Sequence, residues 1–200
     1  MFSHNSSWIM RRPQAHRRAV AVIVLVAVCA CTGGTDLVAN IDTVTYNSAL
    51  FALNGTPVGS PVAINTSLAA TVRIEAIYDF DVAFDLDTSG NTVVYTQRRV
   101  GLPLGSSGRQ VGLQVMPGAF GAVTQAPNGG WAFDSTLTVT LGQVVALRTQ
   151  TPLCQFEISP YLYSKFMVDS VSVTLRRIWV TTLTDPDCGF RDLVPGRPKQ

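Results

Sequence analysis

The sequence predicts an all-β fold, a single antiparallel β-sandwich of the Ig-like or jelly-roll-like kind that follows an N-terminal leader. Short segments of alternating apolar and polar residues recur along the chain, separated by Gly, Pro, Asn and Asp. No segment after the leader combines helical spacing with helix caps, apart from a short helical turn that we expect over residues 161–166. Roughly 165 residues follow the leader and a short tether, enough for one domain with an apolar core.

The first 30 residues have the organisation of a secretory signal peptide. Four arginines between positions 11 and 18 precede an apolar run from Ala19 to Ala30, which is followed by Cys31. The run is shorter than the roughly 20 residues that a transmembrane helix needs, so we favour a cleaved signal over a permanent anchor. Translation from Met10 instead of Met1 would give a leader of the same kind.

The segment from Val28 to Cys31 resembles the lipobox of bacterial lipoprotein signals, in which a small residue precedes a cysteine that is lipidated. The resemblance implies cleavage after Ala30 and a lipidated Cys31 as the new N-terminus. Cys29 is the poorer acceptor because Val28 precedes it. We therefore expect a cell-envelope protein, lipid-anchored at the outer membrane on its periplasmic or surface face, with residues 31–37 as a flexible tether.

Composition after the leader narrows the range of functions. The chain has 15 Lys and Arg and 13 Asp and Glu, and removal of the four leader arginines leaves a net charge of −2. Such a domain lacks the electrostatic footprint of a nucleic-acid binder. Both histidines, His4 and His16, lie in the leader. The mature chain therefore has no histidine for nucleophilic catalysis or for metal binding, and we expect no enzymatic activity and no cofactor.

The domain is expected to span residues 38–194, with an extended C-terminal tail over 195–200. Turn residues at 88–91 predict one hairpin, those at 142–143 predict a second, and those at 128–130 predict a break. The alternation predicts strands over 41–46, 49–53, 69–77, 79–87, 92–100, 109–116, 136–141, 143–150, 155–158 and 168–181.

The last of these strands has a fault in its register. Val171, Val173 and Leu175 share one face, whereas Ile178 and Val180 fall on the other. One extra residue in the strand would return all five side chains to the core. We therefore predict a β-bulge at positions 176–177.

Two cysteines remain after the leader and its lipidation site are set aside. Cys154 and Cys188 lie 34 positions apart, and neither has a second Cys or His beside it, which disfavours a metal or redox site. In an oxidising compartment we expect them to form a disulfide, worth about 4 kcal/mol in the chain-entropy model.

Aspartates at positions 79, 81, 85 and 87 alternate with apolar residues. We interpret them as an exposed acidic stripe rather than as a carboxylate pair for glycoside cleavage. Asp85, Asp87 and Ser89 also resemble the opening of a calcium loop. Thr96 stands where such a loop requires a bidentate Glu, so we favour a hairpin with a polar tip.

Three aromatic residues could contact a ligand. Trp131, Tyr161 and Tyr163 lie beside Gly- and Pro-rich turns and are candidates for a stacking platform, although aromatic residues in such places also fill cores. Our first hypothesis is a non-catalytic structural or protein-binding role, with the membrane and an envelope protein as partners. A glycan-binding module is the alternative, and a hydrolase that uses carboxylates alone is a third reading.

Overall fold

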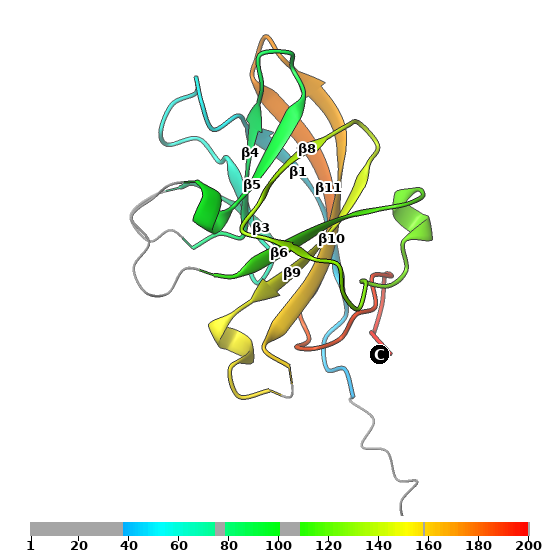
Figure 1. Cartoon of the computed structure of the whole chain (residues 1–200). Helices are drawn as coiled ribbons and strands as arrows, with labels where there is room; N and C mark the ends of the chain where they lie inside the picture. The colour runs from blue at the N-terminus through cyan, green and yellow to red at the C-terminus, as the bar shows by residue number, and fades with distance from the viewer. Residues whose placement is uncertain (1–37, 75–78, 101–108, 158, 200) are drawn as a thin grey trace, which may run out of the picture. The chain divides into compact units, whose positions relative to one another are not determined.

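Two antiparallel β-sheets and three short 3-10 helices make up the regular structure of the described part of the chain (Figure 1). The computed structural model describes residues 38–74, 79–100, 109–157 and 159–199. These ranges contain no α-helix, and none of their helices has the length and apolar character needed to cross a membrane. The prediction of an all-β fold is confirmed, and the paired sheets are consistent with a β-sandwich.

The larger sheet has six strands in the order β1-β11-β10-β9-β6-β7, and every neighbouring pair in it is antiparallel. Its strands are β1 (Val44–Phe51), β6 (Val111–Met116), β7 (Ala132–Phe133), β9 (Val144–Gln150), β10 (Tyr161–Ser172) and β11 (Arg177–Asp185).

The smaller sheet has five strands in the order β3-β2-β4-β5-β8, also antiparallel. Its strands are β2 (Ala63–Asn65), β3 (Ala70–Val72), β4 (Val82–Leu86), β5 (Thr92–Thr96) and β8 (Thr136–Val139). The 3-10 helices are η1 (Gln97–Arg99), η2 (Phe120–Ala122) and η3 (Pro152–Cys154).

The main apolar core lies between the sheets. Phe84 of β4 and Phe166 of β10 meet edge to face with ring centroids 5.3 Å apart, so each sheet contributes one ring to the centre. Both are fully buried. The core also contains Leu50, Ala52, Ile64, Val82, Leu86, Val94, Val111, Leu113, Val139, Val145, Leu147, Val168, Ile178 and Val180.

The prediction of one continuous strand over 168–181 is wrong, because this segment forms a hairpin. β10 ends at Ser172 and β11 begins at Arg177, with a turn between them in which Arg176 has a φ of +47°. Val173 and Leu175 are therefore exposed at the turn rather than buried. The predicted bulge at 176–177 does not exist, but the register does shift between Val168 and Ser170.

Other local predictions also change. The segments 41–46 and 49–53 merge into β1, and residues 161–166 form part of β10 rather than a helical turn. Of 155–158, the described residues form a turn after η3 and not a strand. The predicted hairpin at 88–91 is confirmed, since β4 pairs with β5 around it. The turn at 142–143 instead links β8 of the smaller sheet to β9 of the larger one.

The outer face of the six-stranded sheet is covered along part of its length. Val123, Ala126 and Leu193 pack there against Tyr163 and Leu183 of the sheet. Two backbone hydrogen bonds, both 2.8 Å long, join the covering segments. The Ala126 amide donates to the Arg191 carbonyl, and the Leu193 amide donates to the Thr124 carbonyl. Further on, the Gly196 carbonyl accepts a hydrogen bond from the amide of Thr43, just before β1. The rest of this outer face, toward the β10–β11 turn, carries the groove described next.

Candidate functional site

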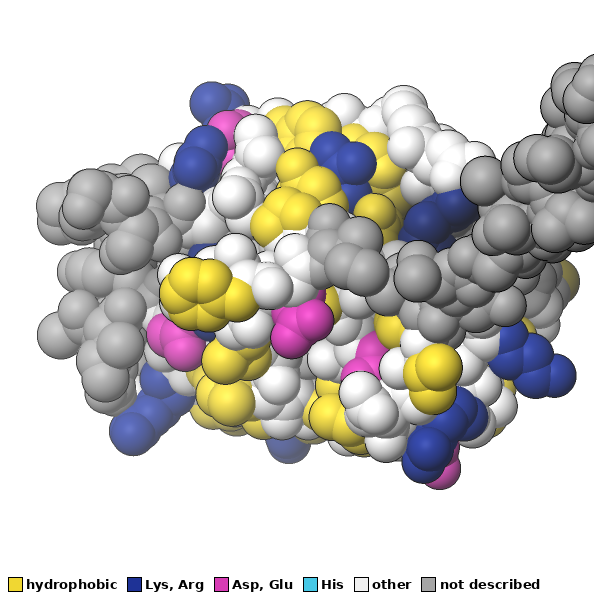
Figure 2. Space-filling view, turned by 90° about the horizontal axis from the view of Figure 1, so that it is seen from below, with side chains coloured by type: hydrophobic (Ala, Val, Ile, Leu, Met, Phe, Trp, Pro, Cys, Tyr) yellow, Lys and Arg dark blue, Asp and Glu magenta, His cyan; other side chains and the backbone are white. Residues whose placement is uncertain are grey.

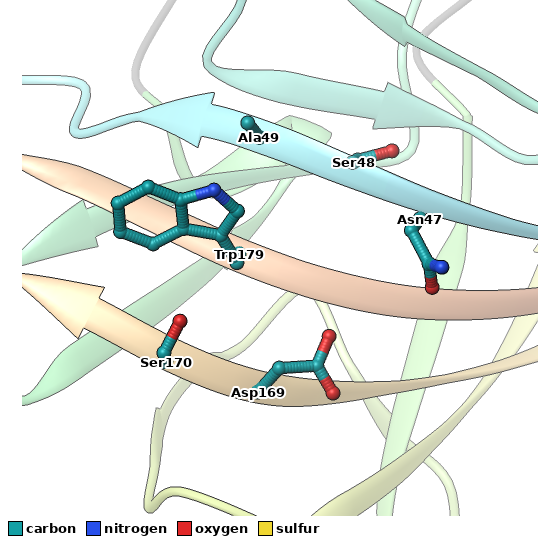
Figure 3. A pocket seen from close by; sticks show the side chains of 6 residues that line it. All are labelled: Asn47, Ser48, Ala49, Asp169, Ser170 and Trp179. Carbon is teal, nitrogen blue, oxygen red and sulfur yellow. The ribbon is translucent and has the colours of Figure 1, made fainter.

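A groove on the outer face of the six-stranded sheet is centred on Trp179 (Figure 3). Trp179 lies opposite Ala49 of β1 and Ser170 of β10, two residues too small to cover its indole. The indole is partly exposed and lies along the sheet surface between these neighbouring strands. The groove has a volume of about 410 Å³ and is lined by Asn47, Ser48, Ala49, Asp169, Ser170 and Trp179.

Polar side chains adjoin the indole on the same face. The Thr181 hydroxyl lies 2.9 Å from Asn47 Oδ1 and 2.8 Å from Asp169 Oδ2, and can donate to either. Asp169 reaches this position because it is the extra residue at the register shift in β10. Figure 3 shows Asn47 on β1 and Asp169 on β10, on either side of β11 and displaced along the strands from Trp179. The groove therefore combines an aromatic surface with an amide and a carboxylate.

Arg177 lies over the indole of Trp179 and over the ring of Phe51. Its guanidinium carbon lies 5.5 Å from the centroid of the Trp179 ring and 4.9 Å from that of Phe51. These three side chains stand on the same outer face, since Phe51 pairs with Arg177 in the strand register. Cation–π contacts of this kind stabilise a fixed orientation of the ring. These contacts hold the indole in one orientation on the sheet.

The aromatic residues singled out in the sequence lie at the other end of the same sheet. The rings of Trp131 and Tyr163 have centroids 6.1 Å apart, and the Arg148 guanidinium lies over Tyr161 at 4.4 Å and over Trp131 at 5.5 Å. Tyr163 is buried, and Trp131 and Tyr161 pack against the covered part of the sheet. The structure therefore brings the three rings together around Arg148, with Tyr163 buried among them.

The prediction of an exposed acidic stripe is wrong for Asp81 and Asp85, which are buried at 0% and 5% exposure. Arg109 donates to Asp81 at 2.9 Å, and Arg176 donates to Asp85 at 3.0 Å. Arg109 also pairs with Asp79 at the surface. The alternation placed these carboxylates on a wet face because it could not show that distant arginines would neutralise them inside the fold.

The residues of the calcium-loop resemblance serve the hairpin instead. Asp87 Oδ1 accepts from the amides of Ser89 and Asn91 at 2.8 Å each, and its Oδ2 accepts from the Asn91 side chain at 2.9 Å. The Asn91 side chain is the main reason that the pKa of Asp87 is lowered. Asp85 faces Asn54 and Arg176 rather than the turn. Within the described residues, no three His, Cys, Asp or Glu side chains gather as metal ligands.

The predicted disulfide is present. Cys154 at the end of η3 is bonded to Cys188, with their Cα atoms 5.6 Å apart. The bond connects the turn before β10 with the segment that follows β11. It thereby anchors the start of the C-terminal segment that covers the sheet. The predicted lipidation site, Cys31, lies outside the described residues, as does the proposed tether.

Two buried titratable groups lie under the covering segments. Lys165 donates from Nζ to the carbonyls of Phe120 at 2.6 Å and Val123 at 2.7 Å, and burial lowers its pKa. Burial also raises the pKa of Asp185 to about 7, although the Asp187 amide donates to its Oδ1 at 2.9 Å. Lys165 thus fastens the covering loop to the sheet.

Sequence reasoning missed the groove around Trp179. The residue could be recognised as outward-facing from its place between Ile178 and Val180, but its neighbours come from two other strands. No protein-family model, curated protein or solved structure matches the chain.

Proposed function

We propose that this protein is an exported, lipid-anchored component of the cell envelope with a non-catalytic binding role, carried by a β-sandwich of the Ig-like or jelly-roll-like kind. The groove around Trp179 carries the proposal. It leaves an aromatic side chain partly exposed on an otherwise well-packed sheet, and its volume of about 410 Å³ lies within the range of ligand sites. A purely structural role would not require this opening.

The leader and the disulfide support the location. The apolar run that ends at Ala30, followed by Cys31, favours export and lipid attachment. A disulfide between Cys154 and Cys188 is typical of an oxidising compartment outside the cytosol. We place the protein at the outer membrane, on its periplasmic or surface face.

The arrangement of the carboxylates supports a non-catalytic role. Asp81 and Asp85 are buried and paired with arginines, so they are committed to the fold rather than to proton transfer. On the face shown in Figure 2, acidic and basic side chains are interspersed, which favours a neutral or mixed partner over a polyanion.

Anchoring is tested by the intact mass of the full chain extracted from membranes, with Cys31→Ser as the control. We expect the wild type to begin at a lipidated Cys31 and the variant to leave the membrane fraction. A wild-type chain with an unmodified N-terminus would contradict anchoring.

Binding is tested by photo-crosslinking in intact cells. A photoreactive residue at Ala49, inside the groove, should give adducts, whereas one at Thr138, exposed on β8 of the other sheet, should not. Equal labelling from both positions would overturn the proposed binding surface.

A further inference from the structure

We infer that the groove around Trp179 binds a saccharide, with one pyranose ring stacked on the indole and its hydroxyls bonded to Asp169 and Asn47. This inference rests on the proposed binding role and names the ligand class of that same surface. A pyranose ring with equatorial substituents has an apolar face of C–H bonds and a rim of hydroxyls. The groove offers a surface for each of these parts.

The apolar face of the sugar fits the indole. Ala49 and Ser170 stand opposite Trp179 on the adjacent strands, so neither rises high enough to shield the ring. Arg177 lies at 5.5 Å from the ring centroid and holds the indole in its orientation. Stacking on a ring fixed in advance avoids the entropy cost of ordering a mobile side chain.

The Asn47 and Asp169 side chains near the indole share a single hydrogen-bond donor. Thr181 has one hydroxyl proton, but its oxygen lies within hydrogen-bond distance of both Asn47 Oδ1 and Asp169 Oδ2. One of these two acceptors therefore lacks the Thr181 proton at any moment. A sugar hydroxyl can donate to that acceptor.

The same pair also offers donors and charge. Among the described residues, the Asn47 amide nitrogen and the Trp179 indole nitrogen have no hydrogen-bond partner, and Asp169 forms no ion pair. Donors and a strong acceptor within one groove match the hydroxyl, which both donates and accepts. Arg177 and Asp169 balance each other in charge, so a neutral saccharide suits the groove better than an acidic one.

The size of the groove agrees with this class of ligand. A volume of about 410 Å³ is at the lower end of the range for small-molecule sites, and the groove is an open depression lined by residues of three strands of one sheet. A protein partner would instead need a larger contiguous interface. We therefore place a short stretch of glycan here rather than a folded protein.

The test is titration of the full chain, solubilised in detergent, with chitohexaose, cellohexaose and maltohexaose. The chain has three tryptophans, Trp8 in the leader, Trp131 and Trp179, so a Trp131→Phe variant leaves Trp179 as the reporter in the chain that remains after leader removal. We expect saturable changes in Trp179 emission with at least one β-1,4-linked hexasaccharide. No response to any of the three overturns the inference.

Variants locate the site. Trp179→Ala should raise the dissociation constant about tenfold or more, and Asp169→Ala should raise it about fivefold. Trp179→Phe should keep the dissociation constant within a few-fold of the wild-type value. Phe156, which is 90% exposed elsewhere, provides the matched control, since Phe156→Ala should leave affinity unchanged. These affinities are measured by calorimetry on variants that keep the wild-type melting temperature within a few degrees. Equal affinity of Trp179→Phe and Trp179→Ala with the wild type would overturn the assignment.

The crosslinking experiment separates the two proposals. Protein adducts from Ala49 without any saccharide binding would overturn the saccharide inference and leave the binding role intact. Absence of both adducts and saccharide binding would contradict the binding role itself.

Discussion

Arg176 and Asp85 join the two sheets through an ion pair. The Arg176 side chain, at the turn between β10 and β11, donates from Nη2 to Oδ1 of Asp85 on β4 at 3.0 Å. It also donates from Nε to the Asn54 carbonyl at 2.6 Å. Asp85 is buried, so its carboxylate depends on this cation and on the Asn54 side chain for compensation.

We predict that Arg176→Ala lowers the free energy of unfolding by about 2–4 kcal/mol, because it leaves a buried carboxylate without its cation. Arg197→Ala is the control, since Arg197 and Asp42 form an ion pair whose side chains are 59% and 66% exposed. That variant should change stability by less than about 1 kcal/mol. Urea denaturation measures the free energy of unfolding of both variants. Equal losses of stability would show that burial of the Arg176–Asp85 pair is unimportant.

The disulfide should contribute strongly to stability. We predict that replacing Cys154 and Cys188 together with Ser lowers the free energy of unfolding by about 2–4 kcal/mol without abolishing the fold. Peptide mapping under non-reducing conditions identifies the bond in protein taken from cells. Free thiols at both positions would contradict this prediction.

Asp185 should make the domain less stable as pH rises. Its folded-state pKa of about 7 exceeds that of an exposed carboxyl, so the folded state binds the proton more tightly than the unfolded state does. The stabilisation from this group is full below about pH 4 and is lost as pH rises through about 7. Asp185→Asn keeps the acceptor for the Asp187 amide and should flatten this dependence.

At pH 8 we expect Asp185→Asn to be more stable than the wild type by about 1–3 kcal/mol. The exposed Asp42→Asn provides the comparison and should leave the pH profile of the wild type in place. Melting temperatures measured between pH 4 and 8 give the answer. A wild-type profile that does not fall over this range would refute the assignment to Asp185.

The extra residue in β10 should be dispensable for folding. Val168 and Val171 both face the core although three positions separate them, because the register shifts between Val168 and Ser170. Deletion of Asp169 would leave them two apart, which keeps them on one face of a regular strand. We therefore predict a folded protein that is destabilised by about 1 kcal/mol or less and that has lost the carboxylate of the groove.

A deletion in a regular strand provides the contrast. β9 pairs on both sides without a shift, so deletion of Ala146 would turn Val145 and Leu147 onto opposite faces. That protein should unfold or lose several kcal/mol of stability. Circular dichroism and thermal unfolding compare the two deletions, and equal damage from both would argue against the bulge.

Local patterns in the sequence were sufficient for several features. The polar turn at 88–91 between alternating segments specified the β4–β5 hairpin, because turn residues and period-two alternation act over a few neighbouring positions. Cys154 and Cys188 were the remaining pair once the leader was set aside, so their bond followed from counting. The same kind of reasoning failed over 168–181, where the turn has an Arg in the left-handed region instead of a glycine.

Near-neighbour patterns in the chain were enough for the β class, the hairpin at 88–91 and the disulfide, and they predict the leader. The burial of Asp85 against Arg176, and the shared groove of Trp179, Asn47 and Asp169, follow instead from long-range packing. These contacts join residues up to 134 positions apart, as Asn47 and Thr181 show. Strand order and register depend on the packing of the whole core, whereas alternation and turn chemistry depend only on near neighbours.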